Sequence, residues 1–165
     1  MVFGSTFTNV TAKNNSAGYR GGGISGRGAS GSSDAFTNVM AKNNSAGSSG
    51  GGISSESGTF TDVTVENNSA DREGGGIYIR STSTLTRVHI RGNESQSDGG
   101  GLYSLGDGVN LSEVMFVGNA AGSDGLGGGG AYIENATLRA VNVQFIGNEG
   151  SRGGGGCTLS AQVDR

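Results

Sequence analysis

The sequence contains no proline and a single cysteine, although glycine supplies 35 of its 165 residues. A collagen triple helix needs abundant proline beside regularly spaced glycine, so this glycine content does not indicate collagen. The one cysteine, Cys157, cannot form a disulfide within the chain, so the fold cannot rest on a disulfide framework. The glycines must therefore serve another structural purpose.

Large apolar residues and charged residues are both scarce. Leu, Ile, Val and Phe together supply 32 of 165 residues, a proportion at which disorder has to be considered. Disordered chains usually combine such a composition with high net charge, but here the net charge is -3 and 15% of the residues are charged. The sequence has no basic patch or polybasic segment, so we expect no nucleic-acid partner.

Signals for export and membrane insertion are missing from the sequence. Residues 1–20 lack the apolar core of a secretory signal peptide, and no window is apolar enough to span a bilayer. We therefore predict no membrane span in these residues and expect any export signal to lie outside them.

The sequence does contain a block that returns six times, which is the signature of a repeat protein. Each block is anchored on one asparagine, and the blocks differ in length by only a few residues. A glycine run ends eight residues after the anchor in five blocks and eleven after it in the fifth, which indicates an insertion near residues 125–127. No block has an uninterrupted helical pattern as long as a typical helix, so strands are expected. The anchors are Asn15, Asn44, Asn68, Asn93, Asn119 and Asn148.

Apolar residues fall into columns when they are counted back from each anchor. Valine stands five before it in every block: Val10, Val39, Val63, Val88, Val114 and Val143. The column eight before the anchor shrinks from Phe7 to Ala140, while the column three before it grows from Ala12 to Phe145. A close-packed interior shared by stacked blocks requires such an exchange of bulk, because it tolerates little change in total volume.

The same spacing predicts the path of each coil. Positions five and three before the anchor alternate as in a strand, the step from eight to five breaks the alternation, and another strand follows each glycine run. This last strand contributes an inward column that runs from Ile24 to Cys157. We therefore predict an all-β, right-handed, single-stranded parallel β-helix, or solenoid, of about six coils in one domain, 1–165; the hand is that of parallel crossovers.

The repeat resembles that of the polymorphic outer membrane proteins and of related right-handed parallel β-helix, or pectin lyase-like, proteins. The motifs that match best are Gly128-Gly129-Gly130-Ala131, Phe116-Val117-Gly118-Asn119 and Phe145-Ile146-Gly147-Asn148. The first four blocks have GGG before Ile or Leu, and Ala, Val or Ile where the family has Phe. The resemblance implies a secreted or cell-surface, outer membrane-associated protein.

The asparagines and glycines are best interpreted as structural. We expect the anchor asparagines to bond to the neighbouring coil and to local backbone at a turn. Seven Asn-x-Ser/Thr sites, which would matter only in a eukaryotic secretory route, arise mostly from repetition of this turn. Gly21, Gly23 and Gly26 satisfy GxGxxG, but the residues that follow do not begin a helix, so no dinucleotide site is predicted.

Three tyrosines, Tyr78, Tyr103 and Tyr132, occupy one outward column in blocks three to five. Tyrosine offers an apolar face and a hydroxyl, so such a column could form a platform that binds sugar rings. The alternative is aromatic pairing between neighbouring strands, which needs no ligand.

Residues suited to catalysis are few. Asp98 and Asp124 precede glycine runs in successive coils, and Glu73 lies close to the same register one coil earlier, so these carboxylates could line a groove. Loop solvation accounts for them equally well. His89 is expected on an exposed strand position, and Cys157 as a small buried apolar residue. We assign no catalytic residue, metal ligand or cofactor.

These observations favour a non-enzymatic, extracellular or cell-surface segment that acts as a structural stalk, an adhesin or a weak glycan-binding surface, with a polysaccharide or a host cell-surface glycan as partner. The alternative is a fragment of a polysaccharide-active enzyme, either pectate lyase-like or glycosidase-like. A finite solenoid needs terminal caps, and neither terminal segment suits one, so we expect a longer solenoid or end-to-end self-association.

Overall fold

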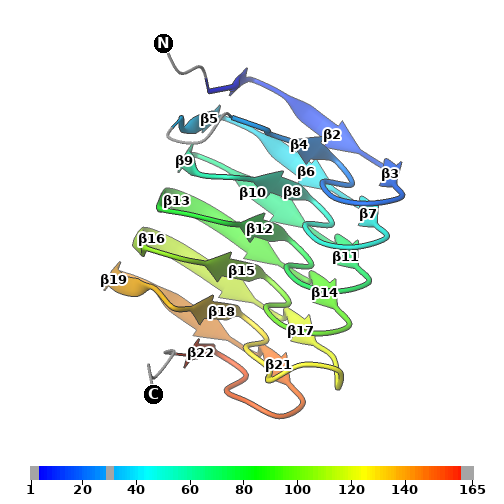
Figure 1. Ribbon diagram of the computed structural model, residues 1–165, viewed down its shortest axis with the longest axis vertical. Helices are drawn as coiled ribbons and strands as arrows, with labels where there is room; N and C mark the ends of the chain where they lie inside the picture. The colour runs from blue at the N-terminus through cyan, green and yellow to red at the C-terminus, as the bar shows by residue number, and fades with distance from the viewer. Residues whose placement is uncertain (1–3, 29–31, 161–165) are drawn as a thin grey trace.

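The computed structural model describes residues 4–28 and 32–160, and it is a parallel β-solenoid of about six coils. The coils are stacked in chain order, with the N-terminal coil at one end and the C-terminal coil at the other (Figure 1). Every strand pairing is parallel and joins a residue to its counterpart in the next coil. The predicted fold is confirmed in these respects, while the right-handed winding stays a prediction.

Sheet 1 has ten strands and turns a corner. In four coils the corner separates two strands, whereas in the fourth and fifth coils one strand continues through it. At the bend, six residues in one column have φ between 51° and 56°: Asn9, Asn38, Asp62, Arg87, Glu113 and Asn142. The strands are β1 (Thr6–Thr8), β2 (Thr11–Lys13), β5 (Asp34–Thr37), β6 (Met40–Lys42), β9 (Gly58–Thr61), β10 (Thr64–Glu66), β13 (Ser83–Arg91), β16 (Gly108–Val117), β19 (Thr137–Val141) and β20 (Gln144–Ile146).

Sheet 2 follows the anchor asparagine and consists of two-residue strands that the sequence analysis did not predict. These are β3 (Ser16–Ala17), β7 (Ser45–Ala46), β11 (Ser69–Ala70), β14 (Glu94–Ser95), β17 (Ala120–Ala121) and β21 (Glu149–Gly150). Sheet 3 follows the glycine runs, as predicted. Its strands are β4 (Ile24–Ser25), β8 (Ile53–Ser55), β12 (Ile77–Ile79), β15 (Leu102–Leu105), β18 (Ala131–Glu134) and β22 (Cys157–Ser160).

The interior is one apolar core formed by the predicted columns. Val39, Val63, Val88 and Val114 are buried, and Val10 and Val143 in the outermost coils are half-buried against the same core. The rings of Phe7, Phe36 and Phe60 stack in one column, and those of Phe116 and Phe145 stack in the other. The exchange of bulk between the two columns is therefore confirmed.

The anchor asparagines form a ladder inside the solenoid. In each step the backbone N–H and the side-chain amide of one asparagine donate to Oδ1 of the next, as Asn68 does to Asn93 at 3.0 and 2.9 Å. The same amide also donates to a backbone carbonyl of the preceding coil, as Asn93 does to Val65 at 3.0 Å. The structural interpretation of this column is confirmed.

The insertion in the fifth block is also confirmed. Gly122 bonds to Ser95 and Gly100 bonds to Gly128, so residues 122–128 span the stretch that residues 96–99 span one coil earlier. The extra residues form a loop in which the side chain of Leu126 is 59% exposed.

Candidate functional site

The tyrosine column is a buried stack. Tyr78, Tyr103 and Tyr132 pair in register on β12, β15 and β18. Successive ring centroids are 5.5 Å apart with nearly parallel planes, and only 5%, 8% and 2% of the three side chains is exposed. They lie outside the main core, in a small apolar cluster with Leu105. The prediction of aromatic pairing between strands is confirmed.

A sugar platform on these three tyrosines stays a prediction, and the burial of the rings does not favour it. Strands of neighbouring coils lie about 4.8 Å apart, so flat rings in one column cover one another instead of turning their faces to solvent. The N-terminal end of the stack is covered as well, because the guanidinium of Arg20 lies 4.9 Å from the centre of the Tyr78 ring. Little ring surface in this column is therefore exposed to solvent.

The stack also alters the acidity of its phenols. Burial raises the pKa of Tyr78 above its ordinary value. Burial is likewise the main cause that raises the pKa of Tyr103, and the hydrogen bond that its hydroxyl donates to the Glu134 carboxylate adds to the effect. Both phenols are therefore held in their neutral form.

We expect this stack to make the fold sensitive to alkali. The pKa of tyrosine in an unfolded chain is about 10, and the folded-state pKa is higher, so the stabilisation is complete below about pH 10 and is lost as the pH rises further. The free energy of unfolding, measured with denaturant between about pH 9 and pH 11.5, should fall steeply. A Tyr78→Phe, Tyr103→Phe double variant should lose less over the same range, and an identical pH dependence of the two proteins would contradict this expectation.

The three carboxylates proposed to line a groove are engaged separately. Glu73 accepts a 2.7 Å hydrogen bond from the Ser49 hydroxyl. Asp98 accepts bonds from the backbone N–H groups of Leu126 and Gly127, at 2.5 and 2.9 Å, and so holds the inserted loop.

Asp124 lies within the inserted loop and is out of register with Asp98. Its backbone N–H bonds to Gln96, and the residue opposite Asp98 in the next coil is Gly127. The expectation that Asp98 and Asp124 share one register is therefore wrong, because the insertion shifts the fifth coil at this point. Within residues 4–28 and 32–160, no three His, Cys, Asp or Glu side chains are placed to hold a metal ion.

His89 and Cys157 are placed as predicted. His89 is exposed on β13, between Thr64 and Met115 in the neighbouring coils. Cys157 continues the inward column of sheet 3 below Ala131, where it is half-buried and burial raises the pKa of its thiol. A raised thiol pKa opposes reactivity, since the thiolate is the nucleophile.

The outer face of sheet 1 holds a ladder of charges. Lys42 and Arg91 both contact the Glu66 carboxylate, at 3.1 and 2.9 Å, and their hydrogen bonds lower its pKa. Arg87 pairs with Asp62 at 2.7 Å beside a shallow hollow of about 530 Å³ that His89 and Met115 also line. Arg87 and Asp62 are both exposed, so their pair contributes little to stability, whereas the Glu66 carboxylate is half-buried between its two partners. Together these pairs give the face an alternating charge pattern.

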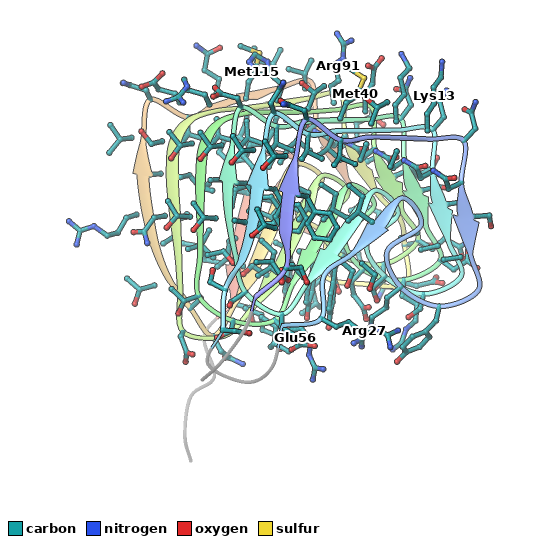
Figure 2. All side chains as sticks on the ribbon, turned by 90° about the horizontal axis from the view of Figure 1, so that it is seen from above. Lys13, Arg27, Met40, Glu56, Arg91 and Met115 are labelled. Carbon is teal, nitrogen blue, oxygen red and sulfur yellow. The ribbon has the colours of Figure 1, made fainter. Side chains whose placement is uncertain are left out.

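A larger hollow lies on the other side of the solenoid, where sheet 3 turns into sheet 1. Its volume is about 820 Å³, and it is lined by residues of the first four coils. Figure 2 places Arg27 and Glu56, two of these residues, opposite the side that bears Lys13, Met40, Arg91 and Met115. We call this hollow the corner groove; the residues of interest in it are Tyr19, Arg20, Arg27, Glu56, Thr59 and Thr84.

Sequence reasoning missed the corner groove, although two signals pointed to it. The first block is one of the two longest, as the spacing between Asn15 and Asn44 shows, and its extra length follows the third strand at residues 26–33. Tyr19 and Arg20 also stand where the second block has Ser48 and Ser49. Both features depart from the repeat, and departures from a repeat are the places where a solenoid surface differs between coils.

No helix that could cross a membrane occurs in the part of the chain that the structure describes.

Comparison with known proteins identifies one related family. No curated protein and no solved structure matches the chain significantly. Residues 62–80, which run from the bend of sheet 1 in the third coil to the residue after β12, match the Chlamydia polymorphic membrane protein repeat, which confirms the resemblance. The match falls in the third block and not at the motifs of the fifth and sixth blocks that were expected to fit best.

Proposed function

We propose that this chain is a non-enzymatic segment of an extracellular or cell-surface protein, in which the solenoid serves as a stalk and its outer surface as a weak glycan-binding adhesin. The observation that supports this most is the in-register stacking of the coils. The inward columns are used for packing and for the asparagine ladder, so contacts with a partner are left to the outward side chains. The repeat match at residues 62–80 supports the surface setting.

The outer columns suit weak, extended contacts with a polymer better than catalysis at a single site. Thr8, Thr37, Thr61, Thr86 and Ser112 form a hydroxyl column on sheet 1. The charge ladder of Lys42, Glu66 and Arg91 lies on the same sheet, beyond the bend. Groups repeated at about 4.8 Å along one axis can meet successive units of a polymer, and several weak contacts then add up.

The proposal is tested by displaying the chain on beads and probing them with an array of neutral and acidic glycans. We expect weak binding to a subset of glycans that strengthens with bead density, because multivalent contacts raise the avidity. Absence of binding to every glycan at every density would contradict the adhesive part of the proposal.

A polysaccharide-cleaving enzyme is the competing function. Glu73 and Asp98 are each occupied by hydrogen bonds to other groups, so the geometry does not favour it. Incubation with polygalacturonate, followed by absorbance of unsaturated products and by a reducing-sugar assay, should show no cleavage. Cleavage that disappears in an Asp98→Asn, Asp124→Asn variant would establish the enzyme instead.

End-to-end self-association stays a prediction. The core residues Phe7 and Val10 in the first coil, and Val143 and Phe145 in the last, are only half-buried. Sedimentation at increasing concentration would reveal stacking of copies, and a sharp monomer at high concentration would count against it.

A further inference from the structure

The corner groove has a surplus of positive charge that the rest of the chain does not share. Arg20 and Arg27 line it, and its acidic lining residue, Glu56, is paired with Arg80 at 3.4 Å. The buried Asp34 carboxylate lies behind the wall and accepts hydrogen bonds from the Ser5 N–H and the Ser55 hydroxyl, so three arginines stand against two carboxylates here. The whole chain has a net charge of -3, so this surplus is local. It favours an anionic ligand over a neutral or cationic one.

Arg20 is held in place without an acidic partner. Its guanidinium lies 5.0 Å from the ring centre of Tyr19 and 4.9 Å from that of Tyr78, and in the described residues no carboxylate forms an ion pair with it. Its buried Nε has no hydrogen-bond partner among these residues. A guanidinium fixed by stacking loses little conformational freedom on binding and can bond a carboxylate or sulfate with two parallel N–H groups.

Tyr19 supplies an aromatic surface at the edge of the groove. Its side chain is 58% exposed, in contrast to the buried tyrosines of sheet 3. One face of its ring lies near Arg20, and the exposure of the side chain leaves contact area for an apolar sugar face. The aromatic contact that the sequence suggested for sheet 3 is therefore available at this corner.

The groove wall is rich in hydroxyl groups, and hydrogen bonds join its described segments. The buried carboxylate of Asp34 accepts a 2.7 Å hydrogen bond from Ser55, and the Ser57 hydroxyl donates to the Ser32 carbonyl at 2.7 Å. Thr59 and Thr84 pair in register on successive coils and line the wall. Neighbouring coils thus repeat hydroxyls at about 4.8 Å, close to the length of a sugar unit.

We propose that the corner groove binds an acidic saccharide, with a carboxylate or sulfate on Arg20 and Arg27, a sugar ring against Tyr19, and further hydroxyls along the column of Thr59 and Thr84. This inference rests on the proposed glycan-binding function and names the ligand class and site within it. The volume of about 820 Å³ is in the range of sites that hold small ligands.

The test is titration calorimetry of the full chain with three probes: trigalacturonate, its fully methyl-esterified form and a sulfated heparin tetrasaccharide. At least one acidic probe should bind, and the two acidic probes together identify the preferred anion. Binding should weaken as salt is added, and the neutral ester should bind at least about tenfold more weakly, the factor expected when a charge-assisted hydrogen bond is lost. Equal binding of the ester and the acid would overturn the proposal.

Two exposed groove residues provide the variants, because neither belongs to the apolar core. Arg27→Gln and Tyr19→Ala should each weaken binding of the acidic probe by about tenfold and leave the circular dichroism unchanged. The control is Arg139→Gln at another exposed arginine, on β19 in the sixth coil, which should leave binding unchanged.

Failure of this inference differs from failure of the proposed function. If acidic probes bind the chain but Arg27→Gln and Tyr19→Ala bind equally well, the groove assignment is wrong while glycan binding stands. If neutral glycans bind on the array and neither acidic probe binds, the ligand class is wrong. If no glycan binds in either experiment, both the groove and the adhesive function are refuted.

Discussion

Replacing Asn93 with alanine is expected to lower the free energy of unfolding by about 3 to 5 kcal/mol. Oδ1 of Asn93 accepts hydrogen bonds from the backbone and side-chain amides of Asn68, at 3.0 and 2.9 Å, and its own amide donates to the Val65 carbonyl. All of this lies inside the solenoid, where Asn93 is 1% exposed. The variant would leave the Asn68 N–H buried without this acceptor, and an unsatisfied buried group is costly.

The control for Asn93 is Asn67, which directly precedes the anchor asparagine of the third coil. This residue is exposed with φ of 52°, and the equivalent residue of the fourth coil is Gly92 with φ of 60°. Asn67→Gly should therefore change stability by less than about 0.5 kcal/mol. Denaturant unfolding monitored by circular dichroism measures both variants. Equal, small losses for the two would show that the ladder contributes little and that its hydrogen bonds are incidental.

Replacing Gly75 with alanine is expected to lower the free energy of unfolding by about 3 kcal/mol, or to prevent the third coil from stacking on the fourth. A Cβ at this position would lie 2.3 Å from the Glu94 carbonyl oxygen and 2.5 Å from that of Gly100. Both atoms belong to the backbone of the next coil, so neither can move without separating the coils. The same close approach recurs at Gly51, Gly100 and Gly129.

The control for Gly75 is a glycine that has a different role. Gly118 has φ of 59°, a Cβ added to it would meet no atom within 4 Å, and its column holds Asn14, Asn43 and Asn67 in earlier coils. Gly118→Asn should thus be nearly neutral, since asparagine tolerates this backbone conformation. Thermal unfolding of the two variants compares them directly. A neutral Gly75→Ala together with a damaging Gly118→Asn would reverse the assignment of the two glycines.

The interior of the solenoid could be predicted from the sequence because packing acts on equal positions in every coil. The valine column and the exchange of bulk between the columns of Phe7 and Ala12 required no knowledge of coordinates. The asparagine column was predictable for the same reason. One asparagine repeated at the same turn in six coils can form hydrogen bonds with the equivalent asparagines above and below it. The two-residue strands such as Ser69–Ala70 were missed because two residues carry no periodic signal.

The outer surface could be predicted less well, because it depends on how side chains of neighbouring coils cover one another. Tyr103 was expected to turn a ring face outward, whereas in-register stacking between Tyr78 and Tyr132 buries it. Asp124 was aligned with Asp98 by its place before a glycine run, but the insertion displaces it. The corner groove arises from Tyr19, Arg20 and the longer first block. These features differ from the other blocks, so a comparison of repeated positions does not reveal them.

The stacking of equivalent positions is the central claim, and electron resonance between paired spin labels tests it most directly, with dipolar line broadening for the shorter separations and pulsed measurement for the longer ones. In a Cys157→Ala background, exposed positions of one column are replaced with cysteine in pairs, each combining Asn14→Cys with a change at Asn43, Asn67, Gly118 or Gly147. The label separation should rise by about 4.8 Å per coil and reach about 24 Å for Asn14 and Gly147, which are five coils apart. Separations that do not grow linearly with coil number, or a broad distribution centred far beyond the expected distance for that last pair, would contradict a stacked solenoid.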